Sequence, residues 1–288
     1  MTVQPADVEP EEQRARTSSW QSDPNFRPPE RVPWSELGPS FIAEWGRDEK
    51  GHPDPEHVEI VGPTGSGKTY LMCTMLQERV AARNSGAVLI CTKPADKTIG
   101  LLGWPVVDSL TAARDRKLRA FVFWPKTSRM GTARKQYQEQ KITGLLHELW
   151  RPDANMIVAF DEVGYVESLS GESRALVQQY WREGRSLGIT VCAMKQRPQG
   201  ALRDMHSETY WTVAFKPKDR ADAERFAELF GAKRDWLPVI DSLSKAKRDF
   251  IIAHTRSEES FISWVDVPLK PRKTERETPH WWRRGTAS

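Results

Sequence analysis

The sequence predicts an α/β fold in which a mostly parallel sheet is flanked by helices. Short apolar runs rich in β-branched residues alternate along the chain with segments whose apolar residues recur at helical spacing. A glycine-rich loop joins the first of these runs to the first helical segment, and acidic or amide side chains follow two later runs. Because ligands of α/β sheets bind at the carboxyl ends of the strands, these side chains are expected to gather beside the glycine loop.

The glycine-rich loop at 62–69 fits the phosphate-binding pattern G-x-x-x-x-G-K-[ST]. Its glycines let the backbone curl until successive N–H groups point at an anion, and the following helix adds its positive end. Lys68 supplies a charge for the β- and γ-phosphates of ATP, and the Thr69 hydroxyl is expected to bind Mg²⁺. The run at 57–61 and the helical spacing over 72–80 give the strand–loop–helix context that the motif requires. The residues expected to hold the nucleotide are Gly62, Pro63, Thr64, Gly65, Ser66, Gly67, Lys68, Thr69 and Tyr70.

Two later runs end in residues suited to phosphate chemistry. A predicted buried strand ends in the adjacent acids Asp161 and Glu162, whose side chains point to opposite sides and can do different work. In phosphate-loop ATPases the first acid holds the metal shell and the second activates water. Asp161, with Thr69, is therefore the predicted metal ligand, and Glu162 is the predicted base. Gln196 ends the next apolar run and is expected to hydrogen-bond the γ-phosphate or the attacking water.

The segment Glu183-Gly-Arg-Ser-Leu-Gly-Ile189, followed by a strand and by Lys-Gln-Arg-Pro at 195–198, resembles the FtsK–HerA superfamily of DNA-pumping P-loop ATPases. That family carries Gly-Arg-x-x-Gly-Ile before its fourth core strand and Thr-Gln-Arg-Pro after it, whereas Lys195 stands here in place of threonine. The resemblance covers about residues 55–255. It implies a RecA-like ATPase of the additional-strand, catalytic-glutamate class. The implied assembly is a homo-oligomeric ring, usually a hexamer, with double-stranded DNA in its channel.

The resemblance also implies roles for individual residues. Gln196 becomes the γ-phosphate sensor, and Arg185, or as second choice Arg182, reaches the nucleotide of a neighbouring subunit. Such an arginine stabilises transition-state charge only across an interface, so hydrolysis would depend on assembly. The expected catalytic set is Lys68, Glu162, Gln196 and Arg185.

Three regions are predicted along the 288 residues. Residues 1–33 are expected to form a disordered arm, because prolines recur there and acids outnumber bases. Residues 34–268 are expected to form the ATPase domain, which ends in a β-hairpin made from the runs at 249–254 and 261–265. Residues 269–288 form a basic, polar tail.

The sequence predicts a cytoplasmic protein of a bacterium or a phage-infected host. No apolar run approaches the length of a membrane span, and the N-terminus lacks a signal-peptide core. Cys73, Cys91 and Cys192 lie in apolar segments outside any metal-binding motif, so reduced core thiols are expected. The large translocases of the FtsK–HerA superfamily have membrane spans and a C-terminal winged-helix domain, neither of which is expected here. This favours compact relatives, such as genome-packaging ATPases of viruses and phages or ATPases of mobile elements.

Two functions remain open from the sequence. The first is a double-stranded DNA translocase, including the packaging of a viral genome, whose expected basic loops 126–135 and 195–203 would face a channel. The second is a Zot-like assembly or export protein in which ATP orders a surface for a capsid, portal or membrane partner. The net charge of +4 permits a nucleic-acid partner without requiring one. A kinase or a GTPase switch fits less well, because adjacent acids suit water activation and no Asn-Lys-x-Asp signature is present.

Overall fold

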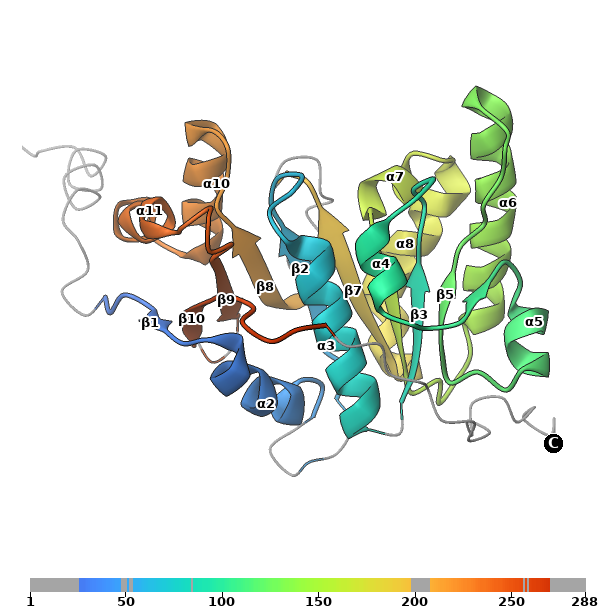
Figure 1. Ribbon diagram of the computed structural model, residues 1–288, viewed down its shortest axis with the longest axis horizontal. Coiled ribbons are helices and arrows are strands. Elements are labelled where there is room, and N and C mark those ends of the chain that lie inside the picture. Colours follow the sequence, from blue (N-terminus) through green and yellow to red (C-terminus); the bar gives the residue numbers. More distant parts are fainter. Residues whose placement is uncertain are drawn as a thin grey trace, which may run out of the picture.

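The computed structural model describes residues 26–47, 51, 54–83, 85–197, 208–255, 257 and 259–269. Within these ranges ten strands form one sheet in the order β1-β10-β9-β8-β2-β7-β6-β3-β5-β4, with helices over both faces (Figure 1). The strands are β1 Glu30–Arg31, β2 His57–Val61, β3 Gly86–Ile90, β4 Val106–Val107, β5 Ala120–Phe123, β6 Met156–Phe160, β7 Ile189–Lys195, β8 Thr209–Phe215, β9 Phe250–His254 and β10 Ser260–Ser263. Every neighbouring pair from β8 to β4 is parallel, and β9 and β10 form an antiparallel hairpin beside β8. The mostly parallel sheet and the C-terminal hairpin are therefore confirmed.

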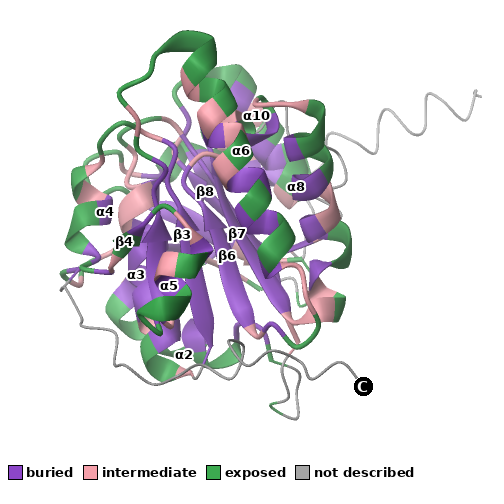
Figure 2. Ribbon diagram, turned by 90° about the vertical axis from the view of Figure 1, so that its right-hand side faces the viewer, coloured by how far each residue is buried: buried purple, intermediate pink, exposed green. Residues whose placement is uncertain are grey.

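Helices cover the sheet because its central strands are apolar on both faces. One core cluster joins α2, α3 and α4 to one face, a second joins α5, α6, α7 and α8 to the other, and a third joins α10 and α11 to β8, β9 and β10. Figure 2 shows the buried strands between helices whose outer sides are exposed. The helical segments are α2 Trp34–Glu44, α3 Lys68–Ala82, α4 Lys97–Leu101, α5 Leu110–Asp115, α6 Gly131–Leu149, α7 Val163–Glu167, α8 Gly171–Glu183, the 3₁₀ turn η1 Gly184–Leu187, α10 Arg220–Phe230 and α11 Lys233–Ser242.

Strand order decides which loops meet. β2 lies between β8 and β7, and β6 follows β7 in the sheet. The glycine loop after β2, Gln196 after β7 and Asp161 after β6 therefore emerge at the same carboxyl edge.

Two predicted boundaries differ from the structure. The predicted N-terminal arm extends to residue 33, which is too far along the chain. Glu30 and Arg31 already pair with β10, and the Phe26 ring packs edge-on against Trp236 at 5.7 Å. Residues 1–25 of the arm and 270–288 of the tail lie outside the described residues. The basic segment expected as a loop over 126–135 is helical from Gly131 onward. Only residues 126–130 of that segment therefore belong to a loop.

The three cysteines are buried free thiols, as expected. In the part of the chain that the structure describes, none of the helices combines the length and apolar character needed to cross a membrane.

Candidate nucleotide-binding site

The glycine loop joins the end of β2 to the start of α3. Gly67 precedes α3 with a φ of 110°, in the left-handed region that favours glycine. At Gly62 an added Cβ atom would lie 2.7 Å from the Cβ of Phe215, so the loop approaches β8 too closely for a side chain. These two glycines permit the curled backbone that phosphate binding requires.

Lys68 and Ser66 place polar groups inside this curl. The Lys68 ammonium donates to the carbonyl oxygens of Gly62 at 2.6 Å and Pro63 at 3.0 Å. The Ser66 hydroxyl is buried and has no hydrogen-bond partner among the residues that the structure describes. Buried polar groups rarely stay unpaired, so a ligand oxygen is the natural partner for Ser66.

The electrostatic surroundings of Lys68 favour an anionic ligand. Burial lowers the pKa of Lys68 to about 8, with Glu162 opposing the shift and the charges of Lys93 and Lys218 adding to it. Further positive charges thus lie close enough to disfavour the charged form of Lys68. A polyanion bound here would stabilise all three ammonium groups at once.

Asp161 follows β6 and is held by the end of β3. Its Oδ1 accepts hydrogen bonds from the backbone N–H of Thr92 at 3.0 Å and from the Thr92 hydroxyl at 2.9 Å. The Lys93 ammonium lies 3.8 Å from Oδ2. Burial raises the pKa of Asp161, and Lys93 and Thr92 oppose this shift. The carboxylate is therefore held in one orientation by neutral donors and balanced by one cation.

Gln196 connects the glycine loop to the second acid. Its side-chain amide donates to Glu162 Oε2 at 2.8 Å, and its Oε1 accepts from the Thr64 hydroxyl at 3.3 Å. Burial raises the pKa of Glu162, which the hydrogen bond from Gln196 opposes. A carboxylate with a raised pKa is a better proton acceptor for an attacking water. Gln196 also touches both the loop that would hold phosphate and the group that would activate water.

One cleft brings together most of the residues predicted for the site. Its walls include Thr64, Gly65, Gly67, Lys68, Thr69, Tyr70, Asp161, Glu162 and Gln196. The predicted contributions of the glycine loop, the acid pair and the glutamine therefore meet in space. The assignment of a chemical role to each residue stays a prediction.

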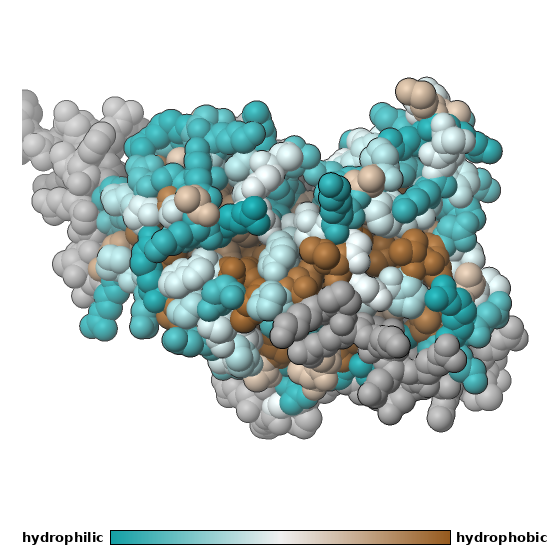
Figure 3. All heavy atoms as spheres, in the orientation of Figure 1, coloured by the Kyte–Doolittle hydropathy of each residue, from teal (hydrophilic) through white to brown (hydrophobic). Residues whose placement is uncertain are grey.

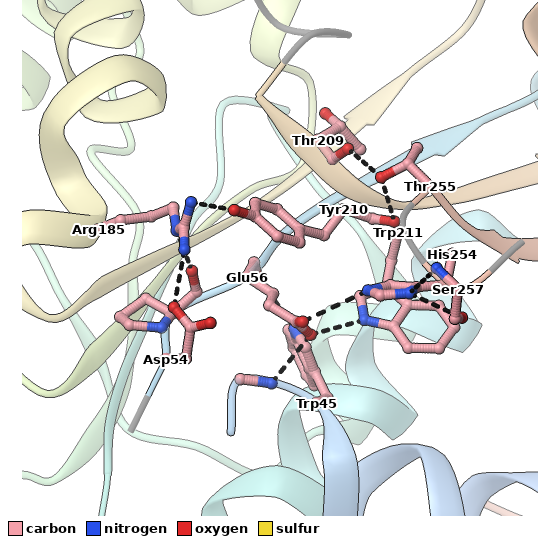
Figure 4. Close-up of polar contacts among 12 residues, drawn as sticks. Trp45, Asp54, Glu56, Arg185, Thr209, Tyr210, Trp211, His254, Thr255 and Ser257 are labelled. Carbon is pink, nitrogen blue, oxygen red and sulfur yellow. Dashed lines mark hydrogen bonds and ion pairs between the residues drawn. The ribbon is translucent and has the colours of Figure 1, made fainter. Parts of the chain in front are cut away.

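Arg185 lies elsewhere. It belongs to η1, which precedes β7, whereas Gln196 follows β7 at the other end of the strand. Its guanidinium donates to Asp54 Oδ1 and to the carbonyl of Pro55, each at 2.7 Å, and to the Tyr210 hydroxyl (Figure 4). Within one chain Arg185 is therefore not part of the cleft, and its predicted role in trans stays a prediction.

Arg248 lines the cleft although no sequence motif indicates it. It lies in the turn between α11 and β9, far along the chain from the glycine loop. Only the antiparallel addition of β9 to β8 brings this turn beside the loop, and that register cannot be read from a motif.

A strand, a glycine loop and a helix, with an acid pair and a glutamine following the next two parallel strands, define the P-loop NTPase fold. No protein-family model matches the chain, and no curated protein matches its sequence. Solved structures of P-loop enzymes do match it in fold.

The matching structures include the genome packaging NTPase B204 from Sulfolobus turreted icosahedral virus 2. In complex with sulfate it has a TM-score of 0.54 and 13% identity, over 75% of this chain and 99% of that one. Its structure in complex with ATP-gammaS has a TM-score of 0.52 and 12% sequence identity, and the match covers 75% of this chain and 100% of that chain. The DNA-packaging ATPase B204 from Sulfolobus turreted icosahedral virus has a TM-score of 0.53 and 14% identity, over 74% and 100%. At these identities the likeness is one of fold, and it agrees with the fold that the sequence motifs implied.

Proposed function

We propose that this protein is an ATPase that hydrolyses ATP to ADP and phosphate and couples this reaction to the movement of double-stranded DNA. The observation that carries the ATPase proposal is the bridge made by Gln196 between the glycine loop and Glu162. A glutamine in this place can hydrogen-bond a γ-phosphate and, at the same time, the group that activates water, so that phosphate binding is coupled to water activation. The fold shared with a genome packaging NTPase in complex with ATP-gammaS supports the proposal.

The chain's own residues divide the work of hydrolysis. The glycine loop binds the phosphates through its backbone N–H groups, and Lys68 neutralises the β- and γ-phosphates. Glu162 accepts the proton of the attacking water, whose position Gln196 fixes through a hydrogen bond. The side-chain amide of Gln196 already donates to Glu162, so the proposed base and the proposed phosphate sensor are in contact before a nucleotide binds.

The residues present fit a magnesium ion held mainly by ATP. Among the described residues no cluster of three or more histidine, cysteine or acidic side chains could hold a metal alone. Mg²⁺ usually keeps several waters and takes one or two protein oxygens plus phosphate oxygens. Thr69 and Asp161 would supply those protein oxygens, and the ion would neutralise phosphate charge.

The proposal of DNA movement rests on a basic surface at one end of α6. Lys126, Arg129 and Lys135 are exposed there, and Met130 between them is 85% exposed. Figure 1 shows α6 projecting past the edge of the sheet. Cations on such a projection suit contact with phosphates in a ring channel, and that contact would be insensitive to sequence and sensitive to salt. The second expected basic segment contributes less than predicted, because Lys195 is buried and residues 198–203 lie outside the described chain.

Two variants test the ATPase proposal. Glu162→Gln should keep ATP affinity and lower the hydrolysis rate by about 10²- to 10⁴-fold, since it removes the proton acceptor alone. Lys68→Ala should weaken ATP binding itself, because it removes a phosphate contact. Equilibrium ATP binding and steady-state phosphate release, measured on the same preparations, separate the two effects. An equal loss of ATP affinity in both variants would contradict the role given to Glu162.

Duplex DNA tests the second half of the proposal. The ATPase rate of the assembled protein should rise when duplex DNA is added at low salt, and the rise should shrink as salt increases. Lys126→Glu and Arg129→Glu together should remove the stimulation and leave the basal rate intact. If DNA neither binds nor stimulates while ATP is hydrolysed, the assembly or export function with a capsid or membrane partner replaces DNA movement.

A further inference from the structure

Arg248 lies across the backbone of the glycine loop. An added Cβ atom on Gly67 would lie 3.2 Å from the Cδ of Arg248 and 3.6 Å from its Cβ, so the aliphatic part of Arg248 passes directly over Gly67. Arg248 lines the cleft that contains Lys68 and Asp161. It also lines a second pocket, which shares Thr64 and Gly65 of the loop with the first and is lined further by Lys216, Lys218 and Lys245. A cationic side chain thus borders the loop on the side of β8 and β9.

The backbone of Arg248 is strained. Its φ is 57°, in the left-handed region that residues with a Cβ atom rarely adopt. Strained residues persist where surrounding contacts fix them, and they cluster at ligand-binding sites. Here the backbone N–H of Arg248 donates to the carbonyl of Lys245 at 3.2 Å, which closes the turn.

Asp249 fixes the turn from the buried side. Its Oδ2 accepts from the backbone N–H of Ser244 at 3.0 Å and from Arg31 of β1 at 2.8 Å. The backbone N–H of Asp249 donates to the carbonyl of Ser244 at 3.0 Å. The turn is therefore held at both ends while Arg248 takes its unfavourable conformation. In that conformation the aliphatic part of the Arg248 side chain lies over Gly67 of the phosphate loop, at the wall of the cleft.

The charge around this turn is mainly positive. The Asp249 carboxylate in the wall of the pocket is already paired with Arg31. Apart from Arg248 itself, the other charged residues in the wall of this pocket are Lys216, Lys218 and Lys245. Figure 3 shows hydrophilic residues over α10 and α11, where acidic and basic side chains pair with one another, so the positive charge is that of the pocket wall and not of these helices. A phosphate chain is the complementary ligand for such a setting.

We propose that Arg248 is a further phosphate-binding residue, which holds the phosphate chain of the nucleotide from the side of the loop opposite Asp161. This inference rests on the proposed function, in which the loop binds ATP. It extends the site by one cation that acts within the same chain, unlike Arg185. It also gives the left-handed backbone of Arg248 a purpose, because the strain keeps the side chain over Gly67.

Arg248→Gly separates binding from folding. Glycine accepts the left-handed φ without strain, so the melting temperature should stay level or rise. The affinities for ATP and for tripolyphosphate, which has no base or ribose, should both fall by about tenfold to a hundredfold, as expected for a charge-assisted hydrogen bond. Isothermal titration at low salt measures both affinities, and a thermal scan measures stability.

Lys117→Gly is the matched control. Lys117 also has a left-handed φ, of 52°, and lies in the turn between α5 and β5. The substitution removes one positive charge and one strained residue, and both affinities should stay unchanged.

Three results would overturn the assignment. A loss of ATP affinity in Arg248→Gly with unchanged tripolyphosphate affinity would assign Arg248 to the base or ribose. Unchanged affinity for both ligands would remove Arg248 from the site. If the unsubstituted protein binds neither ligand, the ATPase proposal fails at the loop itself and the assignment of Arg248 fails with it, which distinguishes that case from the first two.

Discussion

Lys195, the residue that precedes Gln196, forms a buried ion pair with Glu59 of β2. The Lys195 ammonium lies 2.5 Å from Glu59 Oε1, and the two residues are 5% and 0% exposed. Glu167 of α7 is buried nearby: burial raises its pKa, Lys195 opposes the shift, and Glu59 adds to it. The pair therefore connects the strand before the glycine loop with the strand that carries Gln196. A buried charge of this kind is tolerated only while its partner remains.

Removing one partner of this pair should destabilise the fold. Lys195→Met leaves Glu59 buried without its cation and should lower the free energy of unfolding by about 3–5 kcal/mol. Combining it with Glu59→Leu should recover most of the loss, because both charges are then absent. Urea denaturation of the two single variants and the double variant measures the coupling. A loss below about 1 kcal/mol for Lys195→Met would contradict the buried pair.

Single residues also show how far the sequence alone can lead. Four site residues were predictable as neighbours because each follows a strand of a parallel sheet: Lys68, Asp161, Glu162 and Gln196. The burial of Lys195 was not, because a basic residue beside Gln196 resembles the start of a charged loop. The structure extends β7 through Lys195, and strand alternation then turns its side chain away from Gln196 towards Glu59.

At the scale of elements, His57 connects β2 to two neighbours. Its Nδ1 accepts from the backbone N–H of Val191 in β7 at 3.0 Å, and its Nε2–H donates to the carbonyl of Trp181 in α8 at 3.0 Å. The imidazole lies edge-on to the Trp181 ring at 5.0 Å. Burial is the largest cause that lowers the pKa of His57 to about 3. The neutral ring thus supports the amino end of β2, whose other end carries the glycine loop.

This environment predicts a loss of stability in mild acid. The unfolded chain protonates His57 near pH 6.5, whereas the folded chain does so only near 3, so its contribution is complete above pH 6.5 and is lost as pH falls. Between pH 7 and pH 5 the free energy of unfolding should fall by about 2 kcal/mol from this group. His57→Gln, which cannot titrate, should show a pH dependence smaller by that amount in urea denaturation. Equal dependences in the two proteins would contradict the prediction.

Elements differ in how clearly the sequence indicates them. The buried strands were predictable because each is a short apolar run with turn-forming residues at its ends. Helical spacing does not predict α2, which contains Gly38 and Pro39. Packing decides its structure instead: Trp34 and Phe41 are 1% and 3% exposed, and a Cβ on Gly38 would lie 2.7 Å from the Trp34 indole nitrogen. Such tertiary contacts have no local signature.

At the scale of the whole molecule, the sheet separates Arg185 from the nucleotide site of its own chain. β7 has seven residues and spans about 20 Å between Arg185 and Gln196, so no side-chain movement can join them. A catalytic role for Arg185 therefore requires a second copy of the chain, packed with its carboxyl edge against this amino edge. It also requires release from Asp54 and Tyr210, which hold the guanidinium (Figure 4).

Mixing two inactive variants tests this requirement. Arg185→Ala should lower hydrolysis by about 10³-fold and keep ATP binding, because an arginine supplied in trans acts on the transition state. Glu162→Gln is inactive at its own site but still carries Arg185. In mixed assemblies an intact site of the first variant meets Arg185 of the second, so activity should return above the sum of the two separate preparations. The ATPase rate of the mixtures, with their mass by light scattering, measures this.

The same mixing experiment distinguishes a catalytic Arg185 from a purely structural one. Its contacts with Asp54, Pro55 and Tyr210 join the segment that enters β2 to the start of β8, so a purely structural Arg185 would lower stability when replaced. In that case Arg185→Ala should melt earlier, and mixtures that assemble should stay no more active than their parts. Tyr210→Phe supplies the control, because it loosens the same cluster and leaves the guanidinium in place. A trans-acting Arg185 predicts an active Tyr210→Phe protein beside an inactive Arg185→Ala protein of similar stability, which a structural role cannot produce.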